Sequence, residues 1–158
     1  MSLLVFDIDN TLADTKGELM KRVAGFTETI YPFPLSADFF EMNPDVLLGA
    51  EAFEDAAETL QRLNKAGSKI MYVTARPPWF KSLTRHWLML NGFPLATIIC
   101  TSNKREVVER FKPSLLVDDA PYEIERVIDL VEVLVPAKPY NEGYVNRFES
   151  WAVFPQLG

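Results

Sequence analysis

Polar side chains with reactive oxygen atoms follow three separate apolar runs of this 158-residue sequence. They are Asp7 and Asp9 after "LLVF", Thr74 after "KIMYV", and Asp118 with Asp119 after "SLLV". If the runs are parallel strands, these side chains meet, because ligands of an open parallel sheet bind beyond the carboxyl ends of its strands. Four carboxylates in one partly buried crevice repel one another and lose hydration unless a cation neutralises them. The pattern therefore indicates an acidic site built around a cation.

The donor set of this site favours magnesium. Carboxylate oxygens suit a hard divalent cation. Zinc is disfavoured, because the single histidine, His86, and the single cysteine, Cys100, stand at unrelated positions. We interpret Cys100 as a small packing residue, and His86 has no carboxylate or serine partner that would give it a catalytic role. The four aspartates are therefore predicted to hold Mg²⁺.

Donors for an anion are expected beside the carboxylates. Thr74 offers a hydroxyl group, and the amides of Ala75 and Arg76 can face an anion where a turn begins the next helix. Lys104, near the start of a later predicted helix, can bring a positive charge to the same edge. A metal ion, a hydroxyl group, a lysine and backbone amides together form a clamp for a phosphoryl group. The sequence therefore predicts a phosphate-binding site.

Each of these residues could also have a purely structural role. The aspartates could form strand-end turns or cap a helix, and Thr74 could simply end a strand. Lys104 could be an exposed helix residue, with Arg105 or Lys112 pointing inward instead. Arg76 could pair with an acidic residue on the surface.

Alternating strands and helices must position these side chains. The apolar runs predict buried strands at 3–8, 69–73, 97–100, 115–117 and 131–135. Helical spacing predicts helices at 16–30, 53–63, 79–91, 104–111 and 122–130. Gly67 and Gly92 are expected to end two of these helices, Asn103 to cap a third, and Trp79 and Trp87 to lie in the core. The alternation predicts an α/β, Rossmann-like fold with a central parallel sheet and helices on both faces.

Residues 14–50 break this rhythm. They hold the predicted helix at 16–30 and then "YPFPLSADFFEMNP", which is rich in proline and aromatic residues. We interpret them as a short cap insertion after the first strand, within a single domain that spans residues 1–158. Its aromatic residues could stack on a base of a ligand or form the core of the cap itself: Phe26, Tyr31, Phe33, Phe39 and Phe40.

Composition and charge limit the classes of partner. Apolar residues make up 48% of the chain and charged residues 24%, which is ordinary for a globular domain. The net charge of −6 disfavours stable binding to nucleic-acid backbones. We see neither a leader peptide nor an apolar run of about 20 residues that could span a membrane. These features predict a cytoplasmic protein without a membrane partner.

The ordered motifs "DIDNTL", "VTAR", Lys104 and "VDDA" resemble the four motifs of the haloacid dehalogenase-like (HAD) phosphohydrolases. The resemblance covers about residues 3–120. Later segments, "LTRHWLMLNGFP", "LLVDDAPYEIE", "PYN" and "NRFESW", are similar to bacterial proteins related to 5'(3')-deoxyribonucleotidases. The phosphatase domain of polynucleotide kinase-phosphatases is also similar, and Arg76 matches the arginine of its second motif.

The resemblance implies a role for each site residue. Asp7 would be the nucleophile that becomes an aspartyl phosphate, and Asp9 would be the general acid and base. Asp7 and Asp119 would bind Mg²⁺ through their carboxylates, and Asp9 would bind it through its backbone carbonyl. Asp118 would orient the ligands, although either member of the pair could bind the metal. Thr74 and Lys104 would hold the phosphate.

These implications predict a magnesium-dependent phosphomonoester hydrolase that acts on a small phosphorylated substrate, a nucleoside monophosphate above all. Alternatives are a phosphatase for oligonucleotide termini or for another small phosphate ester, a phospho-acceptor switch, and a non-catalytic phosphate-binding module. The insertion is shorter than the cap of nucleotidase relatives, so the site could be open or could be closed by a second subunit of a homodimer.

Overall fold

Six parallel strands form one sheet, in the order β3-β2-β1-β4-β5-β6, in the computed structural model, which describes residues 2–157. The strands are β1 (Leu3–Phe6), β2 (Lys69–Thr74), β3 (Thr97–Cys100), β4 (Leu115–Val117), β5 (Val133–Pro136) and β6 (Arg147–Phe148). The parallel α/β sheet is thus confirmed. Strand β6 was not predicted, because two residues are too few to form a sequence pattern.

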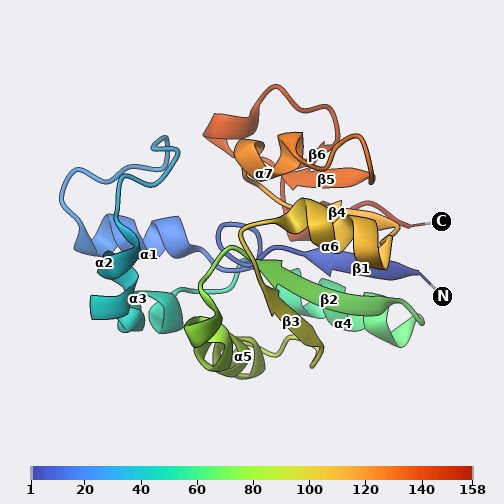
Figure 1. Ribbon diagram of the computed structural model, residues 1–158, viewed down its shortest axis with the longest axis horizontal. Helices are drawn as coiled ribbons and strands as arrows, with labels where there is room; N and C mark the ends of the chain where they lie inside the picture. Colours follow the sequence, from blue (N-terminus) through green and yellow to red (C-terminus); the bar gives the residue numbers. More distant parts are fainter. Residues whose placement is uncertain (1, 158) are drawn as a thin grey trace.

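Helices cover both faces of the sheet, as predicted (Figure 1). The helices are α1 (Thr15–Arg22), α2 (Ala37–Met42), α3 (Pro44–Gly49), α4 (Ala56–Lys65), α5 (Lys81–Leu90), α6 (Lys104–Phe111) and α7 (Pro121–Glu125), and the short 3₁₀ turns are η1 (Pro78–Phe80), η2 (Pro139–Asn141) and η3 (Trp151–Val153). One buried cluster joins the sheet to α4, α5 and η3 through Leu60, Trp87 and Trp151. The other joins the opposite face to α6 and α7 through Val108 and Ile124.

Several predicted boundaries and burials differ from the structure. Helix α1 ends at Arg22 and α7 at Glu125, so the predictions that they reach 30 and 130 were wrong; extended backbone follows α1 at Val23, and tight turns follow α7. Trp87 is fully buried and donates its indole N–H to the carbonyl of Ala50 at 2.7 Å. Trp79 is 65% exposed because it lies in the η1 turn, before α5 begins, so its assignment to the core was wrong.

The predicted helix ends are otherwise present. The side chain of Asn103 accepts the backbone N–H of Glu106 and caps α6. Gly67 and Gly92 follow α4 and α5 with φ angles of 102° and 78°, a region that glycine enters without steric cost. No helix among residues 2–157 is long and apolar enough to cross a bilayer.

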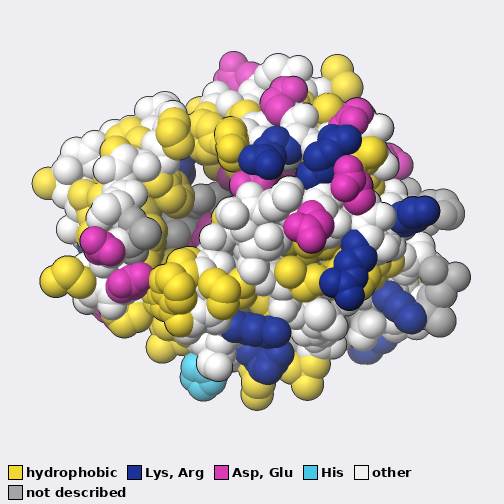
Figure 2. Space-filling model, in the orientation of Figure 1, with side chains coloured by type: hydrophobic (Ala, Val, Ile, Leu, Met, Phe, Trp, Pro, Cys, Tyr) yellow, Lys and Arg dark blue, Asp and Glu magenta, His cyan; other side chains and the backbone are white. Residues whose placement is uncertain are grey.

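Residues between β1 and α4 form a lobe beside the carboxyl ends of the strands, at the left of Figure 1. Its helices α1, α2 and α3 surround a small apolar cluster of Leu19, Phe26 and Val46. On its surface, Arg22 of α1 forms ion pairs with Glu18 and with Asp45 of α3. Figure 2 shows a hollow between this lobe and the body of the sheet.

Candidate active site

The strand order brings the first and last acidic motifs together. After β1, the chain builds β2 and β3 on one side and then returns to place β4 on the other side of β1. Asp7 directly follows β1, and Asp118 and Asp119 directly follow β4. The backbone N–H of Asp7 donates to the carbonyl of Val117 at 2.9 Å, so the two strand ends lie side by side. A crevice where the direction of winding reverses is the usual ligand site of such a sheet.

A tight turn holds the residues after β1. The amides of Leu12 and Ala13 both donate to the carbonyl of Ile8, at 2.9 and 3.0 Å. Asn10 takes a φ of 63°, a left-handed conformation that asparagine tolerates better than most residues. Its side-chain oxygen accepts the backbone N–H of Lys16 at 2.9 Å, which ties the turn to α1.

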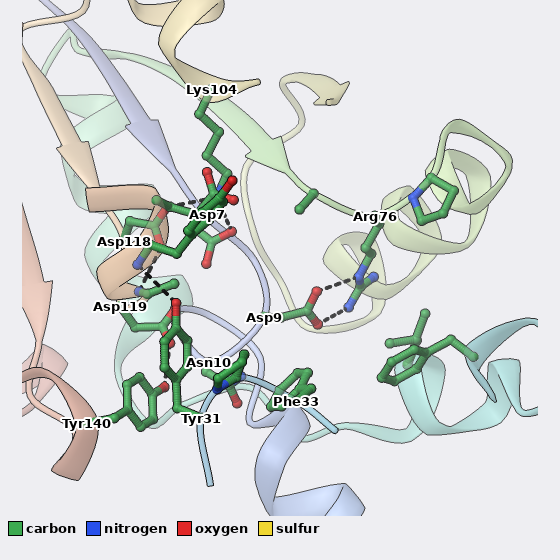
Figure 3. Close-up of a pocket in the computed structure, with 18 of the residues that line it drawn as sticks. Asp7, Asp9, Asn10, Tyr31, Phe33, Arg76, Lys104, Asp118, Asp119 and Tyr140 are labelled. Atoms are coloured by element: carbon green, nitrogen blue, oxygen red, sulfur yellow. Dashed lines mark hydrogen bonds and ion pairs between the residues drawn. The ribbon is translucent and has the colours of Figure 1, made fainter. Parts of the chain in front are cut away.

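Two of the three buried aspartates, Asp7 and Asp118, share the ammonium group of Lys104. Lys104 Nζ donates to Asp7 Oδ1 and to Asp118 Oδ2, both at 2.8 Å (Figure 3). Burial and the charge of Asp118 raise the pKa of Asp7 to about 7, and burial and the charge of Asp7 raise the pKa of Asp119 to about 7. Burial disfavours the charge of Lys104, but the charges of Asp118 and Asp7 outweigh it and raise the pKa of the ammonium. This cluster therefore carries more negative charge than its own lysine neutralises.

The same three aspartates fit a divalent cation. One carboxylate oxygen from each of Asp7, Asp118 and Asp119 lies within 4.8 Å of the other two. All three side chains are buried and offer only oxygen, the donor type that Mg²⁺ prefers. The side chain of Asp9 lies outside this group, which leaves only its backbone carbonyl for the metal contact that was predicted. Both Asp118 and Asp119 are within reach, so the choice between them stays open.

Arg76 holds Asp9, a pairing that the sequence did not reveal. The Nε and Nη2 atoms of Arg76 donate to Oδ2 and Oδ1 of Asp9 at 2.9 and 2.7 Å. Thr15 donates its hydroxyl to Asp9 Oδ1 at 2.6 Å, and Arg76 Nη1 donates to Thr84 at 2.9 Å. Burial alone would raise the pKa of Asp9, but the charge and hydrogen bonds of Arg76 bring it below its ordinary value. The guanidinium therefore acts on Asp9 in this structure, and the phosphate contact predicted for the backbone amide of Arg76 remains a prediction.

The other predicted phosphate ligands lie at the end of β2, the neighbour of β1, and at the start of α6. Ala75 is exposed and lines the cavity. Thr74 is buried, and its hydroxyl accepts the backbone N–H of Arg76 at 3.2 Å. Lys104 reaches the cavity from the first turn of α6, as expected. The phosphate-binding roles of these residues remain predictions.

Two hydroxyl groups fix Asp119, and neither had been assigned a role. Thr11 donates to Asp119 Oδ1 at 3.0 Å and lies 3.2 Å from Asp7 Oδ2. Tyr140 donates to Asp119 Oδ2 at 2.5 Å. The residues stand inside the quoted segments "DIDNTL" and "PYN", but their partners lie about 108 and 21 residues away and leave no local pattern.

A cavity of about 440 Å³ lies between the lobe and the acidic cluster. Its polar floor includes Asp7, Asp9 and Lys104, and its walls are largely aromatic: Tyr31, Phe33 and Phe40 from the lobe, and Phe80, Tyr122 and Tyr140 from the sheet domain. Phe26, Phe33, Phe39 and Phe40 also pack within the lobe's own apolar cluster, as one interpretation of the cap aromatics predicted. Stacking of a cap aromatic residue on a base remains a prediction. Glu123 also lines the cavity, and its buried Oε2 atom has no hydrogen-bond partner among residues 2–157.

Comparisons with known proteins agree with this geometry. The sequence model of the LNS2 domain of PITM 1-3 matches residues 4–118. A curated protein of Bacillus cereus named "Putative nucleotidase" is 32% identical over 106 residues, which make up 63% of this chain and 56% of that protein. The chain thus matches just over half the length of this relative.

Solved structures share the fold at low sequence identity. A HAD family hydrolase from Deinococcus radiodurans, with bound phosphate and sodium, has a TM-score of 0.62 and 16% identity, over 96% of this chain and 92% of that one. A D,D-heptose 1,7-bisphosphate phosphatase from B. bronchiseptica, complexed with magnesium and phosphate, has a TM-score of 0.58 and 13% identity, over 96% and 94%. The chain therefore belongs to the LNS2-domain family, and it shares its fold with solved HAD hydrolases.

Proposed function

We propose that this protein is a magnesium-dependent phosphomonoester hydrolase that acts on nucleoside monophosphates through an aspartyl phosphate at Asp7. One observation carries the proposal: Asp7 lies on the floor of a cavity, held by Lys104 and grouped with two further buried aspartates. The fold shared with solved HAD phosphatases and the relative named a nucleotidase support it.

The chemistry can be assigned to residues of the chain. A carboxylate oxygen of Asp7 attacks phosphorus, and the bond between phosphorus and the ester oxygen breaks. Asp9 donates a proton to the leaving oxygen. A water molecule then gives a proton to Asp9 and attacks the aspartyl phosphate, which releases inorganic phosphate and restores Asp7. Because Arg76 keeps the pKa of Asp9 low, the negative charge of an entering phosphate must help Asp9 to take up its first proton.

Charge neutralisation comes from two sources. Lys104 places its ammonium group beside Asp7 and can contact the phosphoryl oxygens. A magnesium ion, held by Asp7, Asp118 and Asp119 with the backbone carbonyl of Asp9, would neutralise the charge of the phosphoryl group during transfer. Without a cation, a phosphate would meet the excess negative charge of the cluster, so we expect activity to depend on the metal.

The cavity and the net charge support the proposed substrate class. About 440 Å³ suits a ligand of small-molecule size. Tyr31, Phe33 and Phe40 offer aromatic faces for a base, which supports a nucleotide and the role of residues 14–50 as a small cap. The net charge of −6 disfavours a long polyanionic substrate.

A phosphate-release screen tests the proposal. It compares nucleoside 5'- and 3'-monophosphates, sugar phosphates and phosphorylated oligonucleotides, with Mg²⁺ and with EDTA. We expect turnover of monophosphates only with Mg²⁺, and loss of that turnover in Asp7→Asn, which keeps the shape of the side chain but not its nucleophilicity. Thermal unfolding of the variant serves as the folding control. Preferred turnover of phosphorylated oligonucleotides would refute the substrate class, and substantial activity of Asp7→Asn would refute the mechanism.

A further inference from the structure

Residues of the η2 turn donate hydrogen bonds to both the side chain and the backbone of Asp119. The hydroxyl group of Tyr140 donates to Asp119 Oδ2 at 2.5 Å. The side-chain amide of Asn141 donates to the carbonyls of Asp119 and Pro136, each at 2.9 Å. Since Thr11 occupies the other carboxylate oxygen, the orientation of Asp119 depends on where the Tyr140 ring lies.

The position of that ring depends in turn on the cap. Tyr31 belongs to the cap loop, by which we mean residues 26–34, and its ring stacks on Tyr140 with centroids 4.9 Å apart and an interplanar angle of 11°. Figure 3 shows the two rings side by side below Asp119. The hydroxyl oxygen of Tyr31 accepts the backbone N–H of Tyr122 at 3.0 Å, at the start of α7. Through Tyr31, the cap loop therefore contacts Tyr140, the residue that donates to Asp119.

Lys16 fastens the cap loop at the same place. Its ammonium group lies 3.8 Å from the centroid of the Tyr140 ring, and it donates to the backbone carbonyls of Glu28, at 3.3 Å, and Ile30. Lys16 is 6% exposed, so water competes little for these contacts. One buried cation thus joins two cap-loop carbonyls to the face of Tyr140.

We propose that Tyr140 is a positioning residue for the metal ligand Asp119, and that the cap loop controls this position through the stack of Tyr31 on Tyr140. Docking of the cap loop and binding of the metal are then coupled. This inference rests on the metal site of the proposed function. Coupling is reciprocal, so a docked cap loop strengthens metal binding and bound metal stabilises the docked cap loop.

The expected fold-change in Mg²⁺ affinity depends on which contact each substitution removes. Hydrogen-bond partners of metal ligands change metal affinity by roughly 10- to 100-fold when they are removed, so Tyr140→Phe should weaken Mg²⁺ binding about tenfold. Tyr31→Ala removes the stack but leaves the hydroxyl of Tyr140, and should weaken binding roughly threefold, a modest share of an aromatic pair. In a Tyr140→Phe background, Tyr31→Ala should change the affinity by less than about 1.5-fold, because the link to Asp119 is already broken.

The experiment measures Mg²⁺ binding to the full chain by calorimetry, together with amide hydrogen exchange of the cap loop with and without Mg²⁺. Tyr144→Phe is the matched control for Tyr140→Phe, because Tyr144 donates to Glu125 at 2.5 Å on the exposed surface. Phe39→Ala, a cap residue that packs on Phe40, is the control for Tyr31→Ala. Both controls should bind Mg²⁺ as the wild type does, and Mg²⁺ should slow exchange of the cap loop in the wild type but not in Tyr140→Phe.

Two results would overturn the inference while the proposed function stands: unchanged Mg²⁺ affinity in Tyr140→Phe, or an equal effect of Tyr31→Ala in both backgrounds. A purely structural role for the tyrosines would lower the unfolding temperature of the variants and give one of these results. A wild-type chain that binds no Mg²⁺ and releases no phosphate would overturn the inference and the proposed function together.

Discussion

Replacing Arg76 with methionine removes the guanidinium group that holds Asp9. Two charge-assisted hydrogen bonds to Asp9, of 2.9 and 2.7 Å, and one bond to Thr84 are lost. The Arg76 side chain is 4% exposed and that of Asp9 is 24% exposed, so the pair is only partly shielded from water. Breaking a buried ion pair from one side costs about 3–5 kcal/mol, and the partial exposure of Asp9 favours the low end, about 3 kcal/mol. For a chain of this size, that loss lowers the unfolding temperature by roughly 6–12 °C.

The free energy of unfolding that Arg76→Met loses should become smaller as the pH falls. Arg76 keeps the pKa of Asp9 in the folded protein below its ordinary value of 3.8. A lowered carboxyl pKa stabilises the folded state fully above the unfolded pKa, and this contribution disappears as the pH falls through the folded pKa. The stability gap between wild type and Arg76→Met should therefore be widest at neutral pH and should narrow below about pH 4.

Urea unfolding in EDTA measures the gap at neutral pH and at the lowest pH where both proteins stay folded. Arg105→Met is the matched control, because Arg105 also forms a fork with one carboxylate, that of Asp129, at 2.8 and 3.1 Å. That pair is exposed, so its loss should barely change the free energy of unfolding. A gap for Arg76→Met that stayed constant down to acid pH, or that matched the Arg105→Met value, would refute the reasoning.

Three further substitutions test the cluster and the core. In EDTA, Lys104→Met should destabilise the fold by about 3 kcal/mol, because Asp7 and Asp118 lose their shared ammonium group. Mg²⁺ should raise the unfolding temperature of this variant more than that of the wild type, because the ion replaces the lost positive charge. An equal rise in both proteins would contradict this explanation. Trp87→Phe should cost about 2–3 kcal/mol in urea unfolding, since it removes buried volume and the bond to Ala50. Trp79→Phe, at a position 65% exposed, should change stability by less than about 0.5 kcal/mol, and similar costs for both tryptophans would contradict the burial described above.

The strands and the acidic cluster could be predicted because their signals are local. Each apolar run is a strand of the sheet, although only one of the four residues of β3 is buried. Asp7, Asp118 and Asp119 follow strands whose carboxyl ends must share an edge. Predicting that these aspartates meet did not require the order of the strands, because the carboxyl ends of parallel strands all lie at the same edge of the sheet. The helix boundaries were less certain, because propensity alone did not show that α1 ends at Arg22.

The side-chain partners within the site could not be predicted, because they join distant segments. Asp9 and Arg76 are 67 residues apart, and nothing near Arg76 shows that its partner is Asp9 and not an acidic surface residue. Tyr140 looks like any aromatic residue in a loop, and only the folded chain brings its hydroxyl to Asp119 and its ring to Tyr31. Hydrogen bonds between side chains have no periodicity that a single sequence could display.

The central claim is that Asp7 is transiently phosphorylated. Acid quenching during turnover of a nucleoside monophosphate with Mg²⁺, followed by reductive trapping and peptide mass spectrometry, tests it directly. Reduction releases the phosphate and converts a phosphorylated aspartate into homoserine. We therefore predict homoserine in place of Asp7 in the peptide that carries "LLVFDIDNTL", and none in Asp7→Asn. Steady release of phosphate with homoserine at another position, or with none at any time point, would contradict the claim.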